Sequence, residues 1–196
     1  MVLPSRSSRV STGGGTVISR IDNGKALENV RDMLDTLTEH GIRCWVQDGT
    51  LLGLVRDGRV IPWDHDTDVG AFMGDWNQKA HKALLSTGWH LKGTLGKPDN
   101  GLQHRWSRDG IKTDIFFYYT NPDGSVWHAA YVSGMKQYRF TYAPFSTKPM
   151  MTSAGMMLAP DPPEVFLRTK YGEDWRTPKK RWHFARDPKN GRSVRS

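Results

Sequence analysis

Four aspartates are the residues of this chain best suited to chemistry. Asp64, Asp66 and Asp68 are spaced by two, so in an extended segment their side chains project from one face. Three like charges held that close repel one another and raise each other's pKa values unless a cation relieves them. Carboxylates in this pattern suit Mg²⁺ or Mn²⁺ bound together with substrate phosphates, and a solvated acidic turn is the alternative.

The fourth aspartate, Asp114, lies in the segment 112–117, which predicts a largely apolar strand. A carboxylate is expensive to bury in such a strand unless it is paired or bound to metal. If this strand neighbours the aspartate-rich segment, Asp114 lies against Asp66 and Asp68. A salt bridge to a nearby Arg or Lys is the alternative.

A glycine turn precedes these acids in the chain. Asp48-Gly49-Thr50 follows a predicted strand and precedes a helical turn, where backbone N–H groups can approach a phosphate. Arg56 and Arg59 follow closely and can add charge-assisted hydrogen bonds to phosphate. Glycine turn, arginines and aspartates together describe a metal-dependent phosphoryl or nucleotidyl transfer site.

The elements that must position these residues are helices alternating with short strands. Residues 24–40 carry apolar side chains at helical spacing and are closed by Gly41, while Asp109-Gly110 predicts a hairpin turn. Residues 126–158 show no clear pattern. The predicted helices are 24–40, 76–86 and 161–171, with a short helix or turn at 51–55, and the predicted strands are 42–46, 69–73, 102–107 and 112–119.

Composition limits the class of protein. A chain of 196 residues with 37% hydrophobic residues and eight Trp fits one globular domain rather than a disordered segment. No apolar run approaches the roughly 18 to 20 residues that span a bilayer, so no membrane span is expected. The N-terminus lacks a signal-peptide stretch, and the single Cys44 excludes an intrachain disulfide. A cytoplasmic location is therefore expected.

The charge of +8 is unevenly distributed. Residues 1–20 carry +3 and residues 176–196 carry +7, which leaves −2 for residues 21–175. We therefore predict a flexible basic leader at 1–20, one catalytic domain at 21–182 and a solvated basic tail at 183–196. Removing the chain after about Phe184 is expected to leave the chemistry intact.

An acidic body argues against a nucleic-acid partner, because binding to a phosphate backbone needs a basic face. The basic residues at the two ends and four tryptophans that are candidate stacking platforms nevertheless keep a nucleic-acid-associated binding protein as the alternative from another class. They are Trp106, Trp127, Trp175 and Trp182.

Four segments together carry a family resemblance over about residues 26–178. The segments 48–53 (DGTLLG), 56–58 (RDG), 61–70 (IPWDHDTDVG) and 171–178 (YGEDWRTP) closely resemble the signature of the LicD/fukutin family. Thr67 stands where an aliphatic residue is more usual. The resemblance implies an α+β, nucleotidyltransferase-like fold with a small mixed or antiparallel sheet flanked by helices.

The resemblance also implies a function. Members move a phospho-alcohol, such as phosphocholine or ribitol phosphate, from a CDP-activated donor to a hydroxyl of a glycan or another acceptor. The alternative within enzymes is a nucleotidyltransferase that places a nucleotide on a small-molecule or protein hydroxyl, since the sequence leaves open which phosphorus is attacked.

Site roles follow from the same resemblance. Asp66, Asp68 and Asp114 are expected to hold Mg²⁺ or Mn²⁺, with Asp114 as the alternative proton acceptor, and Asp64 is expected to be an accessory ligand. The expected contacts to substrate phosphate are Gly49, Thr50, Arg56, Lys170, Arg176 and Lys179.

Overall fold

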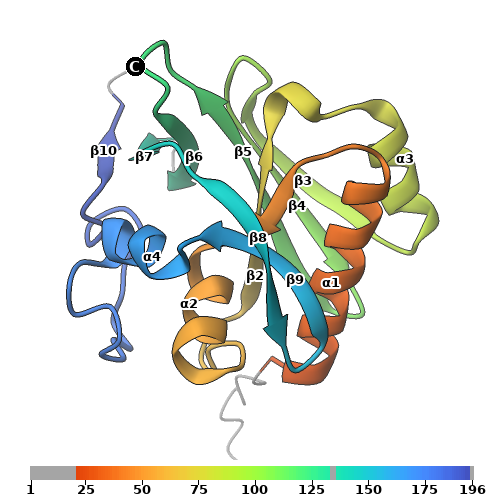
Figure 1. The fold of residues 1–196 in the computed structure, drawn as a ribbon. Coiled ribbons are helices and arrows are strands. Elements are labelled where there is room, and N and C mark those ends of the chain that lie inside the picture. Colours follow the sequence, from red (N-terminus) through yellow and green to blue (C-terminus); the bar gives the residue numbers. More distant parts are fainter. Residues whose placement is uncertain (1–20, 133–135, 195–196) are drawn as a thin grey trace, which may run out of the picture.

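The computed structural model describes residues 21–132 and 136–194, so the predicted leader at 1–20 lies outside the described residues. Helices flank a central sheet (Figure 1). The helices are α1 (Asn23–Glu39), α2 (Asp48–Asp57), the short 3₁₀ helix η1 (Met73–Asp75), α3 (Gln78–Ser86) and α4 (Pro163–Tyr171). The strands are β1 (Cys44–Val46), β2 (Asp66–Phe72), β3 (His90–Lys97), β4 (Asn100–Arg108), β5 (Ile111–Thr120), β6 (Val126–Val132), β7 (Lys136–Tyr142), β8 (Ser146–Thr152), β9 (Gly155–Asp161) and β10 (Gly191–Ser193).

Eight strands of the described chain form the central sheet. They run in the order β1-β2-β5-β6-β7-β10, with β4 also paired to β5 and β3 paired to β4. β2 and β5 are parallel, whereas the other described pairs of this sheet are antiparallel. The prediction of a mixed sheet flanked by helices is therefore confirmed. The sheet is larger than predicted because residues 90–97, residues 126–142 and the C-terminal segment also contribute strands.

Helix α1 begins and ends where its sequence predicts. The Asp22 side chain caps it by accepting a hydrogen bond from the Lys25 backbone N–H at 3.0 Å. After its last turn Gly41 adopts φ 78°, a conformation that favours glycine. The buried face of the helix supplies much of the core through Ala26, Leu27, Val30, Met33, Leu34 and Leu37.

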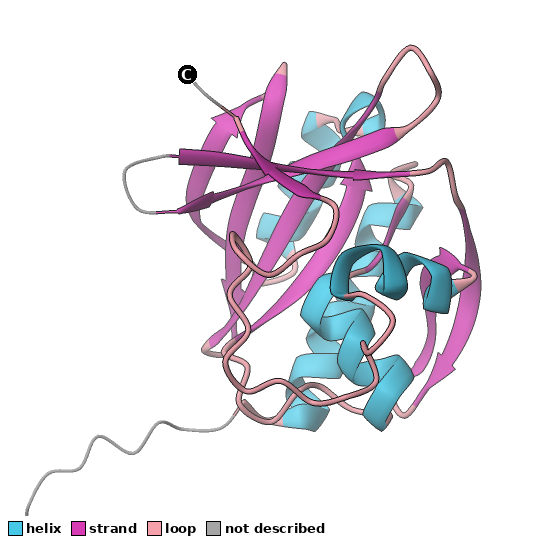
Figure 2. Ribbon diagram, turned by 90° about the vertical axis from the view of Figure 1, so that its left-hand side faces the viewer, coloured by secondary structure: helices cyan, strands magenta, loops and turns pink. Residues whose placement is uncertain are grey.

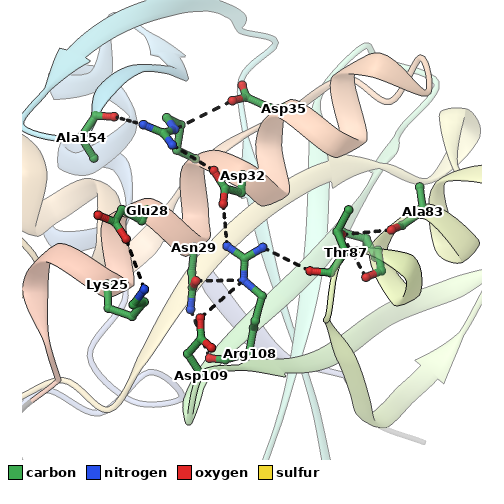
Figure 3. Close-up of polar contacts among 12 residues, drawn as sticks. Lys25, Glu28, Asn29, Asp32, Asp35, Ala83, Thr87, Arg108, Asp109 and Ala154 are labelled. Atoms are coloured by element: carbon green, nitrogen blue, oxygen red, sulfur yellow. Dashed lines mark hydrogen bonds and ion pairs between the residues drawn. The ribbon is translucent and has the colours of Figure 1, made fainter.

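Polar contacts fix α1 to the β4–β5 hairpin (Figure 3). Arg108 donates to Asp32 Oδ2 at 2.8 Å and to Asn29 Oδ1 at 2.9 Å. At the turn itself Asp109 and Gly110 have φ values of 52° and 77°, which confirms the predicted Asp-Gly hairpin. The hairpin therefore has a defined register, and β5 carries Asp114 in a fixed position.

The two faces of the sheet are covered by different helices. On one face Cys44 Sγ donates to the Leu34 carbonyl of α1 at 3.6 Å, and α1 packs with α3. On the opposite face the α2 residue Gly49 contacts Asp68, and α2 packs with α4. Figure 2 shows the strands from the side, with the helices alongside the sheet.

Thr67 lies on the buried face under α1 and α3. Its hydroxyl is 2.8 Å from that of Thr113, and both side chains are fully buried. A cross-strand hydroxyl pair satisfies two polar groups in the core. This contact explains how the chain accommodates a threonine where an aliphatic residue is more usual.

Two predicted boundaries differ near the site. Helix α2 begins at Asp48, earlier than the predicted 51–55, because the Leu51 N–H already donates to the Gln47 carbonyl at 3.0 Å. Strand β2 begins at Asp66 rather than at residue 69, because its parallel pairing with β5 extends back to that residue.

Part of the segment 183–196, which was predicted to be a solvated tail, pairs with the sheet. β10 adds to the edge of the sheet by pairing with β7. The Lys189 N–H also donates to the Lys170 carbonyl at 2.9 Å. Backbone pairing of this kind fixes the segment, which local composition does not reveal.

No helix of the described residues is long and apolar enough to cross a membrane.

Candidate active site

The three aspartates expected to act together lie on two adjacent strands. Asp66 and Asp68 share one face of β2, and Asp68 is the direct register partner of Asp114 on β5. The prediction that a neighbouring strand brings Asp114 against this pair is therefore confirmed. Parallel pairing places the three side chains in one row at the end of the sheet where α2 begins.

Asp64 joins this row at the N-terminus of α2. A Cβ atom on Gly49 would lie 2.7 Å from Asp64 Oδ2 and 3.2 Å from Asp68 Oδ2, so both carboxylates approach the glycine closely. The Gly49 N–H donates to Asp68 Oδ2 at 2.9 Å. A larger residue at position 49 would separate the two carboxylates from the helix.

Thr50 holds the same strand from a second point. Its buried hydroxyl accepts a hydrogen bond from the Asp68 N–H at 2.8 Å. Gly49 and Thr50 were expected to contact phosphate, but in this structure their polar groups contact Asp68 instead. They therefore position a carboxylate, because the first turn of α2 lies directly against β2.

Burial and mutual repulsion dominate the electrostatics of the site. The pKa of Asp68 is raised well above its usual range by burial and by Asp66, Asp48 and Asp64. Burial and Asp66 raise the pKa of Asp64 to about 7. The same two causes raise the pKa of Asp114 to about 6. Each carboxylate thus disfavours ionisation of the others, and a bound cation would reverse that effect.

Asp114 is held by a neutral partner. Gln103 Nε2 on β4 donates to Asp114 Oδ2 at 2.7 Å. Arg105, its register partner on β4, lowers the pKa of the carboxyl by its charge. Asp114 is therefore held by a hydrogen bond from the Gln103 amide and not by the salt bridge considered as the alternative, although the charge of Arg105 acts on it from nearby.

A buried ion pair closes the back of the site. Lys170 of α4 is 4% exposed and its ammonium pairs with the Asp48 carboxylate. Asp48 itself adopts φ 48°, an uncommon conformation for a residue with a side chain. The pair joins two helices and places the Lys170 ammonium near Asp68. Its positive charge lowers the pKa of the Asp68 carboxyl and so offsets part of the rise.

These side chains line a cavity of about 330 Å³, the carboxylate pocket. A second cavity of about 220 Å³, the aromatic cavity, adjoins it and shares Gly49, Asp64, Tyr171 and Trp182. Further residues of the carboxylate pocket include Asp48, Asp66, Asp68, Asp114, Arg105 and Lys170. A ligand that passes from one cavity to the other must therefore pass Asp64 and the N-terminus of α2.

The expected phosphate-binding cations divide into three groups. Lys170 lines the carboxylate pocket, whereas Arg56 and Lys179 line the aromatic cavity. Arg56 forms an ion pair with Asp57 at 2.8 Å, and Lys179 forms one with Asp174 at 2.7 Å. Arg176 is exposed, stacks over the Trp175 ring at 4.0 Å and lines neither cavity. The structure therefore brings Lys170 to the aspartates and leaves Arg176 outside.

Sequence reasoning missed Asp48 and Arg105 as site residues. Asp48 stands in the quoted glycine motif, but the turn propensity of Asp-Gly obscured its role. Gln103 and Arg105 alternate with apolar neighbours in the predicted strand 102–107. That alternation was the available signal, because every second residue of a strand points to the same face of the sheet. Gln103 and Arg105 therefore share one face, which is the face of Asp114.

The four tryptophans do not form a stacking surface. Trp106, Trp127 and Trp175 are at most 6% exposed and belong to the interior. Trp182 lines both cavities, and Trp175 lines the aromatic cavity. The tryptophans therefore give no support to a nucleic-acid-binding protein.

The donor set fits a hard divalent cation. The site offers oxygen ligands, and its buried carboxylates repel one another. As the side chains lie, however, no group of three or more Asp, Glu, His and Cys residues within 21–132 and 136–194 is arranged to hold a metal ion. Side-chain rotation would have to bring the carboxylate oxygens onto a common centre.

Comparison with known proteins places this geometry in context. The family model described as LicD/FKTN/FKRP, nucleotidyltransferase domain, matches residues 41–160. Ribitol-5-phosphate transferase FKTN of Macaca fascicularis is 30% identical over 159 residues, which are 79% of this chain and 34% of that protein. Ribitol 5-phosphate transferase FKRP of Homo sapiens is 42% identical over 48 residues, 24% of this chain and 10% of that protein. The chain thus spans about a third of the FKTN relative.

Among solved structures, lincosamide antibiotic adenylyltransferase LnuA, bound to lincomycin, is similar with a TM-score of 0.50 and 15% identity. The likeness covers 74% of this chain and 87% of that one. At this identity it concerns the fold alone, and it supports a nucleotidyltransferase-like arrangement of the strands that carry the aspartates.

Proposed function

Because the chain belongs to the LicD/FKTN/FKRP family through its nucleotidyltransferase domain, we propose that it is a metal-dependent transferase of phospho-alcohols. The phospho-alcohol, of the phosphocholine or ribitol phosphate type, comes from a CDP-activated donor and goes to a hydroxyl of a glycan. The observation that carries the proposal is the row of Asp66, Asp68 and Asp114 on two register-paired strands within the matched region. Relatives named as ribitol-phosphate transferases support the group that is transferred.

Asp66 and Asp68 would hold Mg²⁺ or Mn²⁺, with Asp64 as an accessory ligand. The ion would supply stabilisation of the negative charge that develops on the phosphoryl and leaving-group oxygens. Gly49 and Thr50 keep Asp68 in place from the first turn of α2. Asp68 is thus held in position before substrate arrives, whereas the other carboxylates would rotate to reach the ion.

The chain's own cations and Asp114 supply the remaining groups. Lys170 and Arg105 approach the pocket from α4 and β4, so each can donate hydrogen bonds to phosphate oxygens from its own side. Gln103 occupies Asp114 Oδ2, so Oδ1 is the oxygen that would accept the proton of the attacking hydroxyl.

The test is turnover of a panel of CDP-alcohols and nucleoside triphosphates with Mg²⁺ or Mn²⁺, comparing the wild type with Asp66→Asn and Asp68→Asn. Asp99→Asn, at an exposed position in the β3–β4 turn, is the matched control. We expect metal-dependent hydrolysis of a CDP-alcohol, in which water takes the phospho-alcohol in place of the glycan hydroxyl and CMP is released; both site variants should lose this activity and the control should keep it. Release of CMP without metal, or unchanged in both site variants, contradicts the proposal. Release of pyrophosphate from a nucleoside triphosphate identifies a nucleotidyltransferase instead.

A further inference from the structure

Residues 176–189, here called the basic segment, follow α4 and run beside the site towards β10 (Figure 1). They contain six basic side chains and a single acid, Asp187. Lys179 pairs with Asp174 and Arg186 with Asp187, whereas no carboxylate within residues 21–132 and 136–194 is in ion-pair range of the other four. All six basic side chains are exposed, namely Arg176, Lys179, Lys180, Arg181, Arg186 and Lys189.

The basic segment is held against the fold. The Trp182 ring lies 4.8 Å from the Tyr171 ring of α4. The Lys189 N–H donates to the Lys170 carbonyl at 2.9 Å, and within the segment the His183 N–H donates to the Asp187 carboxylate at 2.7 Å. The positive charge is therefore displayed on a fixed surface of the protein.

Two exposed aromatic rings flank this charge. Trp63 is 39% exposed and Phe184 is 36% exposed, and within residues 21–132 and 136–194 no other Phe, Trp or Tyr side chain is exposed. Phe184 belongs to the basic segment itself, and Lys180 Nζ lies 5.8 Å from the centroid of the Trp63 ring. Exposed aromatic rings gathered beside cations, rather than scattered over the molecule, indicate an interaction surface.

The combination of rings and cations matches a membrane surface that contains anionic lipids. Trp and other aromatic side chains are favoured at the level of the lipid headgroups, where one part of the ring is apolar and another part is wet. Lys and Arg side chains near such a surface gain from its negative potential. A bilayer therefore offers a favourable environment to both kinds of side chain at once.

The placement of the rings favours a broad surface over a single polymer strand. Trp63 lines the aromatic cavity, whereas Phe184 lines the carboxylate pocket. Single-stranded nucleic acid stacks successive bases on rings along one groove, but these two rings stand at different cavities. A membrane contacts both without having to follow one groove.

We propose that the basic segment, together with Trp63, docks the protein on an anionic phospholipid surface. The Trp63 and Phe184 rings enter the headgroup layer, and the cations Lys180, Arg181 and Lys189 contact lipid phosphates. Because each ring lines a cavity of the site, docking holds the site next to the membrane surface. The inference concerns where the protein is held and does not depend on which group it transfers.

The experiment measures sedimentation of the full chain with vesicles of phosphatidylcholine alone and of equal parts phosphatidylcholine and phosphatidylglycerol. A cation variant replaces Lys180, Arg181 and Lys189 with Gln, and a ring variant replaces Trp63 and Phe184 with Ala. Each has a matched control on the exposed surface of α3 and β3. The controls are Lys79→Gln with Lys82→Gln and Lys92→Gln, and Leu85→Ala with Leu91→Ala.

We expect the wild type to bind the mixed vesicles and to bind phosphatidylcholine alone far more weakly. The cation variant should bind the mixed vesicles about a hundredfold more weakly, since each cation near an anionic surface contributes about fivefold. The ring variant should bind about tenfold more weakly, because affinity also scales with the apolar area that enters the interface. Both control variants should match the wild type.

Equal binding of the mixed vesicles by the wild type and either site variant overturns the proposal. Tighter binding of single-stranded oligothymidylate, which displaces the protein from the vesicles, overturns it in favour of nucleic acid. Quenching of the tryptophan fluorescence of the wild type by brominated lipids in the mixed vesicles provides a readout that needs no variant. Absence of quenching on vesicles that bind the protein shows that no ring enters the headgroup layer and also overturns the proposal.

Discussion

Replacing Asp64 with Asn should stabilise the metal-free protein and weaken its binding of Mn²⁺. Asp64 is a half-buried carboxylate beside Asp66, and both desolvation and that neighbour oppose its charge. Asn has the same shape and keeps an oxygen to accept the His65 N–H bond of 3.1 Å. The substitution therefore removes an unfavourable charge while retaining the contact.

The size of the effect follows from the pKa of Asp64, which is raised from 3.8 to about 7. At about 1.4 kcal/mol for each pH unit, the ionised carboxylate costs the folded state at most about 4 kcal/mol. The cost is shared with Asp66, so we expect Asp64→Asn to recover about 2 kcal/mol at pH 8. For a chain of this size that corresponds to a rise in Tm of about 4 to 8 °C.

The sign of the pH dependence follows from the same pKa. Between pH 4 and pH 7 the folded state binds more protons at Asp64 than the unfolded state does. The contribution of this group to the stability of the metal-free wild type should therefore be greatest below about pH 4 and should be lost as the pH rises to about 7. The Asp64→Asn variant should lose less stability over that range.

Thermal unfolding of wild type and variant at pH 5 and pH 8, each with a chelator and with Mn²⁺, measures these effects. The exposed Asp99→Asn serves as the control and should follow the wild type. Mn²⁺ should raise the Tm of the wild type more at pH 8 than at pH 5, and raise that of Asp64→Asn less. A variant with a Tm at pH 8 equal to or below that of the metal-free wild type would refute the reasoning.

Three further predictions concern the walls of the pocket. Lys170→Met should destabilise the protein by about 3 to 5 kcal/mol because it leaves Asp48 buried without its partner. The double variant Lys170→Met with Asp48→Asn should recover part of that stability, as measured by chemical denaturation. No recovery would show that the two residues are not coupled. Arg105→Gln should raise the KM for the donor at least about tenfold through the loss of a charge-assisted bond, and a KM equal to that of the wild type would exclude Arg105 from donor binding. Truncation after Phe184 removes β10 and the Lys189 bond to Lys170, so it should lower both Tm and turnover, whereas an unchanged Tm would restore the solvated-tail prediction.

Several features of this chain could be predicted from residues that lie close together in the sequence. Alternation places Asp64, Asp66 and Asp68 on one side of any extended segment, and an isolated acid in an apolar strand identifies Asp114. Helix α1 and the Asp109-Gly110 turn are likewise encoded by short-range signals, namely helical spacing with a cap and a dipeptide that accepts positive φ. These features were predictable because each depends on residues within one or two turns of chain.

Contacts between distant residues were not predictable in the same way. The pairing of Asp48 with Lys170 joins residues more than a hundred positions apart. Lys170 reads in the sequence as an ordinary basic residue of a helix, and its burial follows only from the packing of α4 against α2. The pairing of β10 with β7 is equally invisible in the composition of a basic segment.

The sequence by itself determined the family, because the aspartates and the motifs around them resemble the LicD/fukutin signature, and it identified the carboxylates that could act as oxygen ligands. Only the tertiary structure decided how those groups are used. It hydrogen-bonds Gly49 and Thr50 to Asp68, and it brings Trp182 of the basic C-terminal segment to both cavities. The reason is that the energy of a long-range contact depends on both partners and on the order of the strands between them, which no local pattern contains.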